Sequence, residues 1–143
     1  MASLQTVFLC FLAIVITNHV SGAPSTQAEI TPVEVDVYYE ALCPDSRRFF
    51  LKQLWPTYSK IGSNIILELI PYGNAHVSGS PDKWTFTCQH GPEECLGNMI
   101  QTCAAEILNN TMDSLKFVVC AFNTVRQDFI IKECIRDKEL QKK

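Results

Sequence analysis

The chain has 143 residues, of which 47% are hydrophobic, so it holds enough apolar side chain for the core of one domain. Its formal net charge is -3, and its basic residues are scattered apart from the Arg47-Arg48 pair and a short basic tail. A nucleic-acid-binding surface needs Lys and Arg along a whole face, so the charge pattern excludes that class of partner.

The first 22 residues contain no charged residue and carry an apolar run from Val7 to Ile16. This pattern predicts a secretory signal peptide, residues 1–22, cleaved after Gly22. The alternative is a signal anchor, but the run is shorter than the roughly 20 apolar residues that span a bilayer, and no later segment is long enough. We therefore predict no membrane span and a location outside the cell, as a secreted protein, or in the lysosome through the secretory pathway. Residues 23–32 predict a flexible leader, which precedes a domain from 33 to 143.

Six cysteines follow the signal peptide, which itself contains Cys10: Cys43, Cys88, Cys95, Cys103, Cys120 and Cys134. An even set in an oxidising compartment is typical of a disulfide framework, although its connectivity cannot be read from sequence. If one of them is a reactive thiol instead, an odd number is left, and the pairing cannot close within one chain. The pairing state is therefore a test of function.

The clearest structural signal is a β-α-β unit. Apolar residues alternate over Val33–Tyr39, which predicts a strand, and the Ile- and Leu-rich segment Asn64–Gly73 predicts a second strand buried on both faces. Between them, apolar side chains at helical spacing predict a short helix, capped by Asp45 or Ser46 and kinked or ended early at Pro56. Such a crossover makes the two strands parallel in one sheet.

The remaining chain predicts mostly helices. Residues 74–83 are rich in turn formers and predict a loop, which a short aromatic strand at about 84–87 follows. Helices are predicted over about 92–108, 114–122 and 130–140. The sequon Asn109-Asn110-Thr111 predicts a glycoprotein with Asn109 on its surface.

Cys43 lies between the first strand and the helix, where reactive sites gather in open α/β sheets. A helix N-terminus favours the thiolate, the species that attacks disulfides, and Arg47 and Arg48 add positive charge there while Asp45 opposes it. Ser46 stands where a Cys-x-x-Cys motif has its second cysteine, so Cys43 can attack a disulfide but the chain cannot resolve the mixed disulfide itself. The alternative is that Cys43 is one end of a framework disulfide.

A second group of chemistry-bearing residues runs from Cys88 to Cys103. It offers four potential zinc ligands: Cys88, His90, Cys95 and Cys103. Their spacing differs from that of zinc fingers and ribbons, and an oxidising lumen disfavours thiolate ligands, so we predict no metal. His90 is interpreted as a hydrogen-bonding loop residue, with a general base as the alternative. Cys95 and Cys103 lie about 12 Å apart along a helix, too far to bond each other.

The same segment resembles the signature of a known family, the gamma-interferon-inducible lysosomal thiol reductases (GILT). The matching positions are Cys88, Gln89, His90, Gly91, Glu94, Cys95, Asn98 and Cys103. The stretch from Val33 to Cys43 is similar to the family's active-site strand and thiol. The resemblance implies an α/β, thioredoxin-like fold with an inserted helical, disulfide-containing region, and reduction of disulfide-containing proteins.

The chain departs from the family pattern in two ways. The family's Cys-x-x-Cys is here Cys43-Pro44-Asp45-Ser46, so the attacking role passes to Cys43 and the resolving role is vacant at Ser46. Thioredoxin-like folds also add a later β-hairpin entered by a cis-proline, and no proline follows Pro92, so we predict that the C-terminal β-hairpin is absent. The first strand would then keep an unpaired edge, which favours self-association.

The resemblance implies a secreted or lysosomal thiol oxidoreductase that acts through one attacking thiol, in host defence or in antigen and protein degradation. Ser46 would hydrogen-bond the Cys43 thiolate, and an external small thiol such as glutathione or cysteine would be the reductant, with no other cofactor. One alternative is a catalytically weak or inactive secreted binding protein of the same fold. Another is a truncated gene product with no independent fold.

Overall fold

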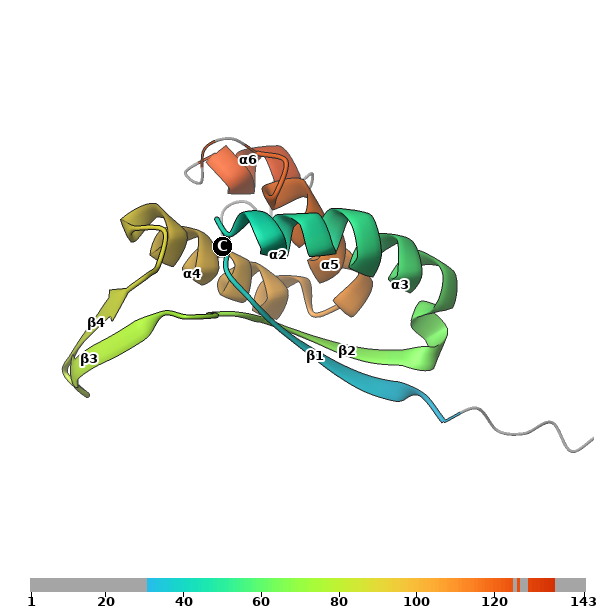
Figure 1. Ribbon diagram of the computed structural model, residues 1–143, viewed down its shortest axis with the longest axis horizontal. Coiled ribbons are helices and arrows are strands. Elements are labelled where there is room, and N and C mark those ends of the chain that lie inside the picture. Colours follow the sequence, from blue (N-terminus) through green and yellow to red (C-terminus); the bar gives the residue numbers. More distant parts are fainter. Residues whose placement is uncertain (1–30, 125, 127–128, 136–143) are drawn as a thin grey trace, which may run out of the picture. The chain divides into compact units, whose positions relative to one another are not determined.

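The computed structural model describes residues 31–124, 126 and 129–135. The predicted signal peptide, most of the predicted leader and the end of the last predicted helix lie outside these residues. Figure 1 shows the described elements, coloured along the sequence from the N-terminus to the C-terminus.

A parallel pair of strands forms the centre of the fold. Strand β1, Val33–Tyr39, pairs along its whole length with β2, Ile65–Pro71, in the register Val33 to Ile65 through Tyr39 to Pro71. Because a helical crossover joins the two strands, their parallel direction confirms the predicted β-α-β unit.

The crossover helix is longer than predicted. It runs as α2, Pro44–Phe49, a π-helical segment, Phe50–Leu54, and α3, Trp55–Ile61, before a 3-10 turn, Gly62–Asn64, leads into β2. Of the two effects predicted for Pro56, a kink or an early end, the early end is wrong, because the helix continues to Ile61. The π-type hydrogen bond from the Trp55 N–H to the Phe50 carbonyl widens the helix directly before Pro56, whose ring and missing N–H would disturb an ordinary α-helical ladder.

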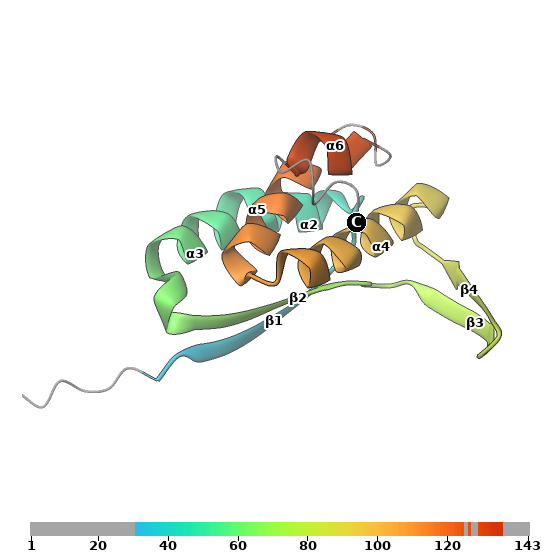
Figure 2. The same cartoon turned by 180° about the vertical axis from the view of Figure 1, so that it is seen from behind.

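Helices cover one face of the strand pair. In both Figure 1 and Figure 2 the crossover helix, α4 and α5 lie on the same side of β1 and β2. Phe50 and Leu115 are completely buried in this layer, and burial of side chains of this size contributes about 1.5–3 kcal/mol each. The core cluster consists of Val37, Tyr39, Phe50, Leu54, Tyr58, Leu67, Leu115, Val118 and Phe122.

The opposite face of the strand pair is exposed. Tyr38 is 68% exposed and Ile66 is 55% exposed, so the prediction that β2 is buried on both faces is wrong. Within the described part of the chain no helix packs on this face, so the apolar side chains that alternate with the core residues point to solvent.

A second, antiparallel pair replaces part of the predicted loop 74–83. Strand β3, His76–Ser80, pairs with β4, Lys83–Thr87, and every residue of both strands is exposed. The sequence gives no alternating pattern over β3 because neither face is buried, which is why the strand resembles a loop. Gly79, with φ of +111°, supplies a backbone conformation that other residues rarely adopt.

Three further helices complete the described fold: α4, Pro92–Leu108, α5, Thr111–Ala121, and α6, Ile130–Cys134. Helix α4 has the predicted bounds. Helix α5 begins three residues before the predicted start because the Asn110 side chain caps it, accepting a 3.0 Å hydrogen bond from the Asp113 N–H. No helix in the described ranges has both the length and the apolarity to cross a bilayer.

Candidate active site

Cys43 lies in the turn that joins β1 to the crossover helix. Its backbone is extended, with φ of -65° and ψ of 124°, and it is the residue that precedes the first helical position, where Asp45 or Ser46 was expected. Its carbonyl accepts a 3.0 Å hydrogen bond from the Arg47 N–H. The Cys43 thiol is free and half-buried, so the structure does not place it in a framework disulfide.

The polar residues that follow Cys43 have partners of their own. Ser46 Oγ accepts a 3.3 Å hydrogen bond from the Glu40 N–H. Arg47 Nε donates to the Phe122 carbonyl at 2.7 Å, and Arg48 pairs with Asp45 at 3.0 Å on the exposed surface. The positive charge expected to favour a thiolate is thus partly committed to other acceptors.

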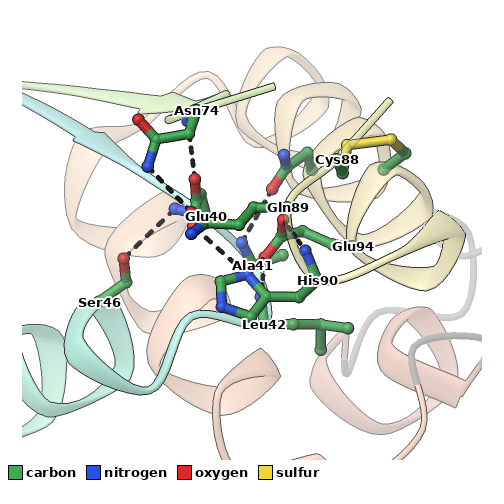
Figure 3. Close-up of polar contacts among 11 residues, drawn as sticks. Glu40, Ala41, Leu42, Ser46, Asn74, Cys88, Gln89, His90 and Glu94 are labelled. Atoms are coloured by element: carbon green, nitrogen blue, oxygen red, sulfur yellow. Dashed lines mark hydrogen bonds and ion pairs between the residues drawn. A yellow bond between two sulfur atoms is a disulfide. The ribbon is translucent and has the colours of Figure 1, made fainter. Parts of the chain in front are cut away.

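One face of α4 holds the backbone that leads into Cys43. Glu94, Asn98 and Gln101 are almost completely buried, at spacings that place them on the same side of the helix. Asn98 Oδ1 accepts from the Ala41 N–H at 2.9 Å. Glu94 Oε2 accepts from the Leu42 N–H at 3.3 Å (Figure 3). These bonds satisfy the backbone donors of the two residues before Cys43 and so hold the backbone that positions the thiol.

Gln101 extends this polar face to β1. Its Oε1 accepts a 2.8 Å hydrogen bond from the Tyr39 hydroxyl, while its Nε2 has no partner among the described residues. Burial raises the pKa of Tyr39 far above its ordinary value, so the side chain is a neutral phenol that donates its proton to Gln101.

His90 lies next to two buried carboxylates. Its Nδ1 is 2.6 Å from Glu94 Oε2 and 3.4 Å from Glu40 Oε2, and its backbone N–H donates to Glu94 Oε1 at 3.0 Å (Figure 3). One ring nitrogen of His90, the Cys43 sulfur and a Glu40 oxygen lie within 4.8 Å of one another. The sequence predicts His90 to be a hydrogen-bonding loop residue, and the fold adds that it borders the thiol.

The loop that carries His90 is fixed at both ends. Cys88 and Cys95 form a disulfide with a Cα separation of 5.6 Å, which joins the residue after β4 to the first turn of α4. Gly91 has φ of +90°, so the chain turns sharply there in a way that favours glycine. Asn74 donates through its Nδ2 to Gln89 Oε1 at 3.0 Å and through its backbone N–H to Glu40 Oε1 at 2.7 Å.

The other cysteines are not gathered at the thiol. Cys120 and Cys134 form a second disulfide, which links α5 to α6, and Cys103 is a free, exposed thiol on α4. The zinc alternative built on Cys88, His90, Cys95 and Cys103 therefore fails, because two of its thiolates are consumed in a disulfide. Asn109, the sequon residue, is exposed at the end of α4.

An apolar pocket of about 460 Å³ lies between the β3–β4 hairpin and α4. Phe86 contributes to it from β4, and Leu96 and Met99 contribute from α4. The Cys88–Cys95 disulfide forms part of its lining, so the pocket lies beside the loop that carries His90. Trp84 and Phe86 are both more than half exposed on the same hairpin, which adds aromatic surface near the pocket.

The β-α-β unit, the free thiol at its turn and the disulfide-containing helical region define an α/β protein with a helical, disulfide-containing region. A family model described as "Gamma interferon inducible lysosomal thiol reductase (GILT)" matches residues 34–138. Because this match covers most of the chain, the chain belongs to the GILT family.

Curated relatives agree with this membership. The chain is 47% identical over 78 residues to a gamma-interferon-inducible lysosomal thiol reductase of Carassius auratus, covering 54% of this chain and 31% of the relative. It is 39% identical over 87 residues to the Mus musculus protein of the same description, covering 61% of this chain and 35% of the relative. A gamma-interferon-responsive lysosomal thiol protein of Arabidopsis thaliana is 30% identical over 135 residues, and the match covers 93% of this chain and 54% of the relative. The chain thus spans about a third to a half of the length of these relatives.

Proposed function

We propose that this protein carries out thiol–disulfide exchange on disulfide-containing proteins, with Cys43 as the attacking thiol. The observation that carries the proposal is the state of the cysteines: Cys43 is free and accessible at the start of a helix, while four others form disulfides elsewhere. Membership of a family described as thiol reductases supports the same chemistry.

The proposed reaction has three exchange steps. The Cys43 thiolate attacks one sulfur of the substrate disulfide, forms a mixed disulfide and releases the other substrate sulfur as a thiolate, which takes up a proton. An external thiol such as glutathione or cysteine then attacks the Cys43 sulfur, releases the second substrate thiol and becomes linked to Cys43. A second external thiol then attacks the sulfur of the first external thiol and releases the Cys43 thiolate, so the substrate disulfide is reduced and the two external thiols are joined in one disulfide.

The neighbours of Cys43 have distinct proposed roles. Ser46 receives a hydrogen bond from Glu40 through its oxygen, so its own proton is available to stabilise the Cys43 thiolate. His90 lies near enough to Cys43 to exchange a proton with it after a small side-chain movement, while Glu94 holds the imidazole in place. No metal or organic cofactor takes part in the proposed exchange.

We further propose that the protein enters the secretory pathway and acts outside the cell or in the lysosome, in host defence or in antigen and protein degradation. The apolar stretch at the start of the sequence and the exposed sequon at Asn109 support passage through the secretory pathway. Self-association through the free edge of β1 is proposed because no described strand pairs with that edge.

Reduction of a disulfide-bonded substrate protein by the mature chain, with excess cysteine as reductant, tests the exchange chemistry. Cys43→Ser is expected to abolish turnover, and without external thiol the wild-type chain is expected to accumulate as a mixed disulfide at Cys43 by peptide mapping. Cys103→Ser is the matched control, because it removes the other free thiol and is expected to leave turnover unchanged. Equal turnover by Cys43→Ser and the wild type would contradict the proposal.

A second candidate is a binding protein of the same fold with little or no turnover. The apolar pocket beside the exposed Trp84 and Phe86 favours this alternative, because apolar surface of this kind suits an extended polypeptide. The two functions separate with one pair of variants. Binding of a partner that survives Cys43→Ser but is lost with Trp84→Ser, in a protein without detectable turnover, would favour binding alone.

A further inference from the structure

We propose that Glu40, Cys43 and His90 form a binding site for a thiophilic divalent metal ion such as Zn²⁺. The proposal concerns a set of ligands that differs from the one excluded above, since it shares only His90 with that set. It goes beyond the proposed exchange reaction, because binding of a metal requires no turnover.

The three side chains offer one donor of each type that zinc prefers: a thiolate, an imidazole nitrogen and a carboxylate oxygen. Their donor atoms lie within 4.8 Å of one another. In a tetrahedral site with ordinary zinc–ligand lengths the donors are about 3.5 Å apart. A rotation of the half-buried Cys43 side chain and a shift of about 1 Å therefore suffice to close the site.

The surroundings already hold two of the three ligands in place. Glu94 Oε2 contacts His90 Nδ1 at 2.6 Å and so orients the imidazole, as in the carboxylate–histidine–metal arrangement common in zinc proteins. Glu40 Oε1 accepts from the Asn74 N–H at 2.7 Å, which leaves Oε2, 3.4 Å from His90 Nδ1, as the oxygen for the metal.

Charge favours a cation at the same place. Glu40 and Glu94 are almost completely buried, and His90 is the one basic side chain that the described contacts place beside them. Buried carboxylates are costly unless they are paired or bind a metal. A dication would balance them, and the thiol would release its proton on binding.

The three ligands come from segments that the fold keeps together. Glu40 and Cys43 flank the Ala41–Leu42 backbone, which Asn98 and Glu94 hold from α4. The disulfide between Cys88 and Cys95 closes the loop that carries His90. Cys43 is half-buried and His90 is exposed, so solvent can supply a fourth ligand. A metal here would cover the Cys43 sulfur and compete with a disulfide substrate for it.

Direct titration of the mature chain, with its disulfides intact and Cys103→Ser as the background, tests this site. Calorimetry with Zn²⁺ is expected to give one equivalent bound, and Co²⁺ is expected to show thiolate-to-metal charge-transfer absorption. Cys43→Ser should remove the absorption, and Cys43→Ser, His90→Ala and Glu40→Gln should each weaken affinity by more than about tenfold. His76→Ala, an exposed histidine on β3, is the matched control and should change affinity by less than about twofold.

Protection of the thiol gives a second readout that does not depend on Glu40→Gln folding. Zn²⁺ is expected to slow alkylation of Cys43 by about tenfold or more, a chelator should restore the rate, and His90→Ala should remove the protection. Binding that survives Cys43→Ser, or that is lost with His76→Ala, would overturn the site. A chain that binds Zn²⁺ without reducing disulfides would reject the exchange reaction and leave the site standing, and the reverse result would reject the site alone.

Discussion

At the residue scale, the residues that resemble the family signature largely support the backbone around Cys43. Asn98 and Glu94 accept hydrogen bonds from consecutive N–H groups, and Gly91 and the Cys88–Cys95 disulfide shape the loop in between. A buried, polar face of α4 thus replaces the apolar contact that a core helix usually makes.

Asn98→Ala is expected to destabilise the protein by about 1–3 kcal/mol, because the buried Ala41 N–H would lose its acceptor. Urea unfolding of the mature chain measures this change. Met99→Ala, on the exposed side of the same turn, is the matched control and should change the free energy of unfolding by less than about 0.5 kcal/mol. An equal effect of the two variants would show that the Asn98 hydrogen bond contributes nothing.

Ionisation of Tyr39 is expected to lower the stability of the folded state at alkaline pH. Burial raises the pKa of its phenol in the folded state, so the folded state binds the proton more tightly than the unfolded state does. The stabilisation is complete below the unfolded pKa of about 10 and declines as the pH rises above it. Urea unfolding at pH 8 to pH 11, at about half-unit steps, should show this decline.

The control for this prediction is Tyr39→Phe. It removes the titrating group together with the 2.8 Å bond to Gln101, so it should lower stability at pH 8 and flatten the alkaline decline. A decline of the same steepness in the variant would assign the effect to another group.

At the element scale, the two disulfides join different parts of the fold. Cys88–Cys95 ties the end of the β3–β4 hairpin to α4, and Cys120–Cys134 ties α5 to α6. Only the first lies in the loop that carries His90. The hairpin itself is exposed throughout. Its position relative to α4 therefore depends on the Cys88–Cys95 disulfide and on Phe86, which lines the pocket beside α4.

Replacement of both Cys88 and Cys95 by Ser is expected to cost about 2.5 kcal/mol, from the loop entropy of a seven-residue separation. The same change at Cys120 and Cys134, whose separation is 14, should cost about 3 kcal/mol. Both costs are measured by urea unfolding. Turnover should separate the two variants, because only the first loosens His90. Equal turnover in the two folded variants would contradict a role for the His90 loop.

The sequence predicted those elements whose buried face is regular. The β1 strand, the parallel pairing with β2 and the bounds of α4 follow from apolar periodicity and turn residues, and the structure confirms them. The sequence does not predict β3, because neither face of this strand is buried. It predicts too short a crossover helix, because the π-helical turn before Pro56 lets the helix continue past the proline. Local sequence patterns contain no information about either feature.

At the scale of the whole molecule, the exposed sequon and the predicted signal peptide lead to a joint prediction. Protein expressed with its full sequence in a eukaryotic secretory system is expected to begin at Ala23 and to carry an N-glycan at Asn109, as mass spectrometry before and after deglycosylation would show. Asn109→Gly should remove the glycan and keep the helix end intact, because Asn109 has φ of +45°. An unmodified, intracellular product would contradict both parts.

The sequence by itself determined the β-α-β unit, the strand-to-helix position of Cys43 and the resemblance of residues 88–103 to a family signature, because these depend on residue type and spacing along the chain. Tertiary structure decided which cysteines pair, which face of the strand pair is covered and that His90 lies beside Cys43 and Glu40. The contacts of His90 and α4 with the end of β1 join residues about 50 positions apart, and the packing of α4 against the end of β1 brings them together.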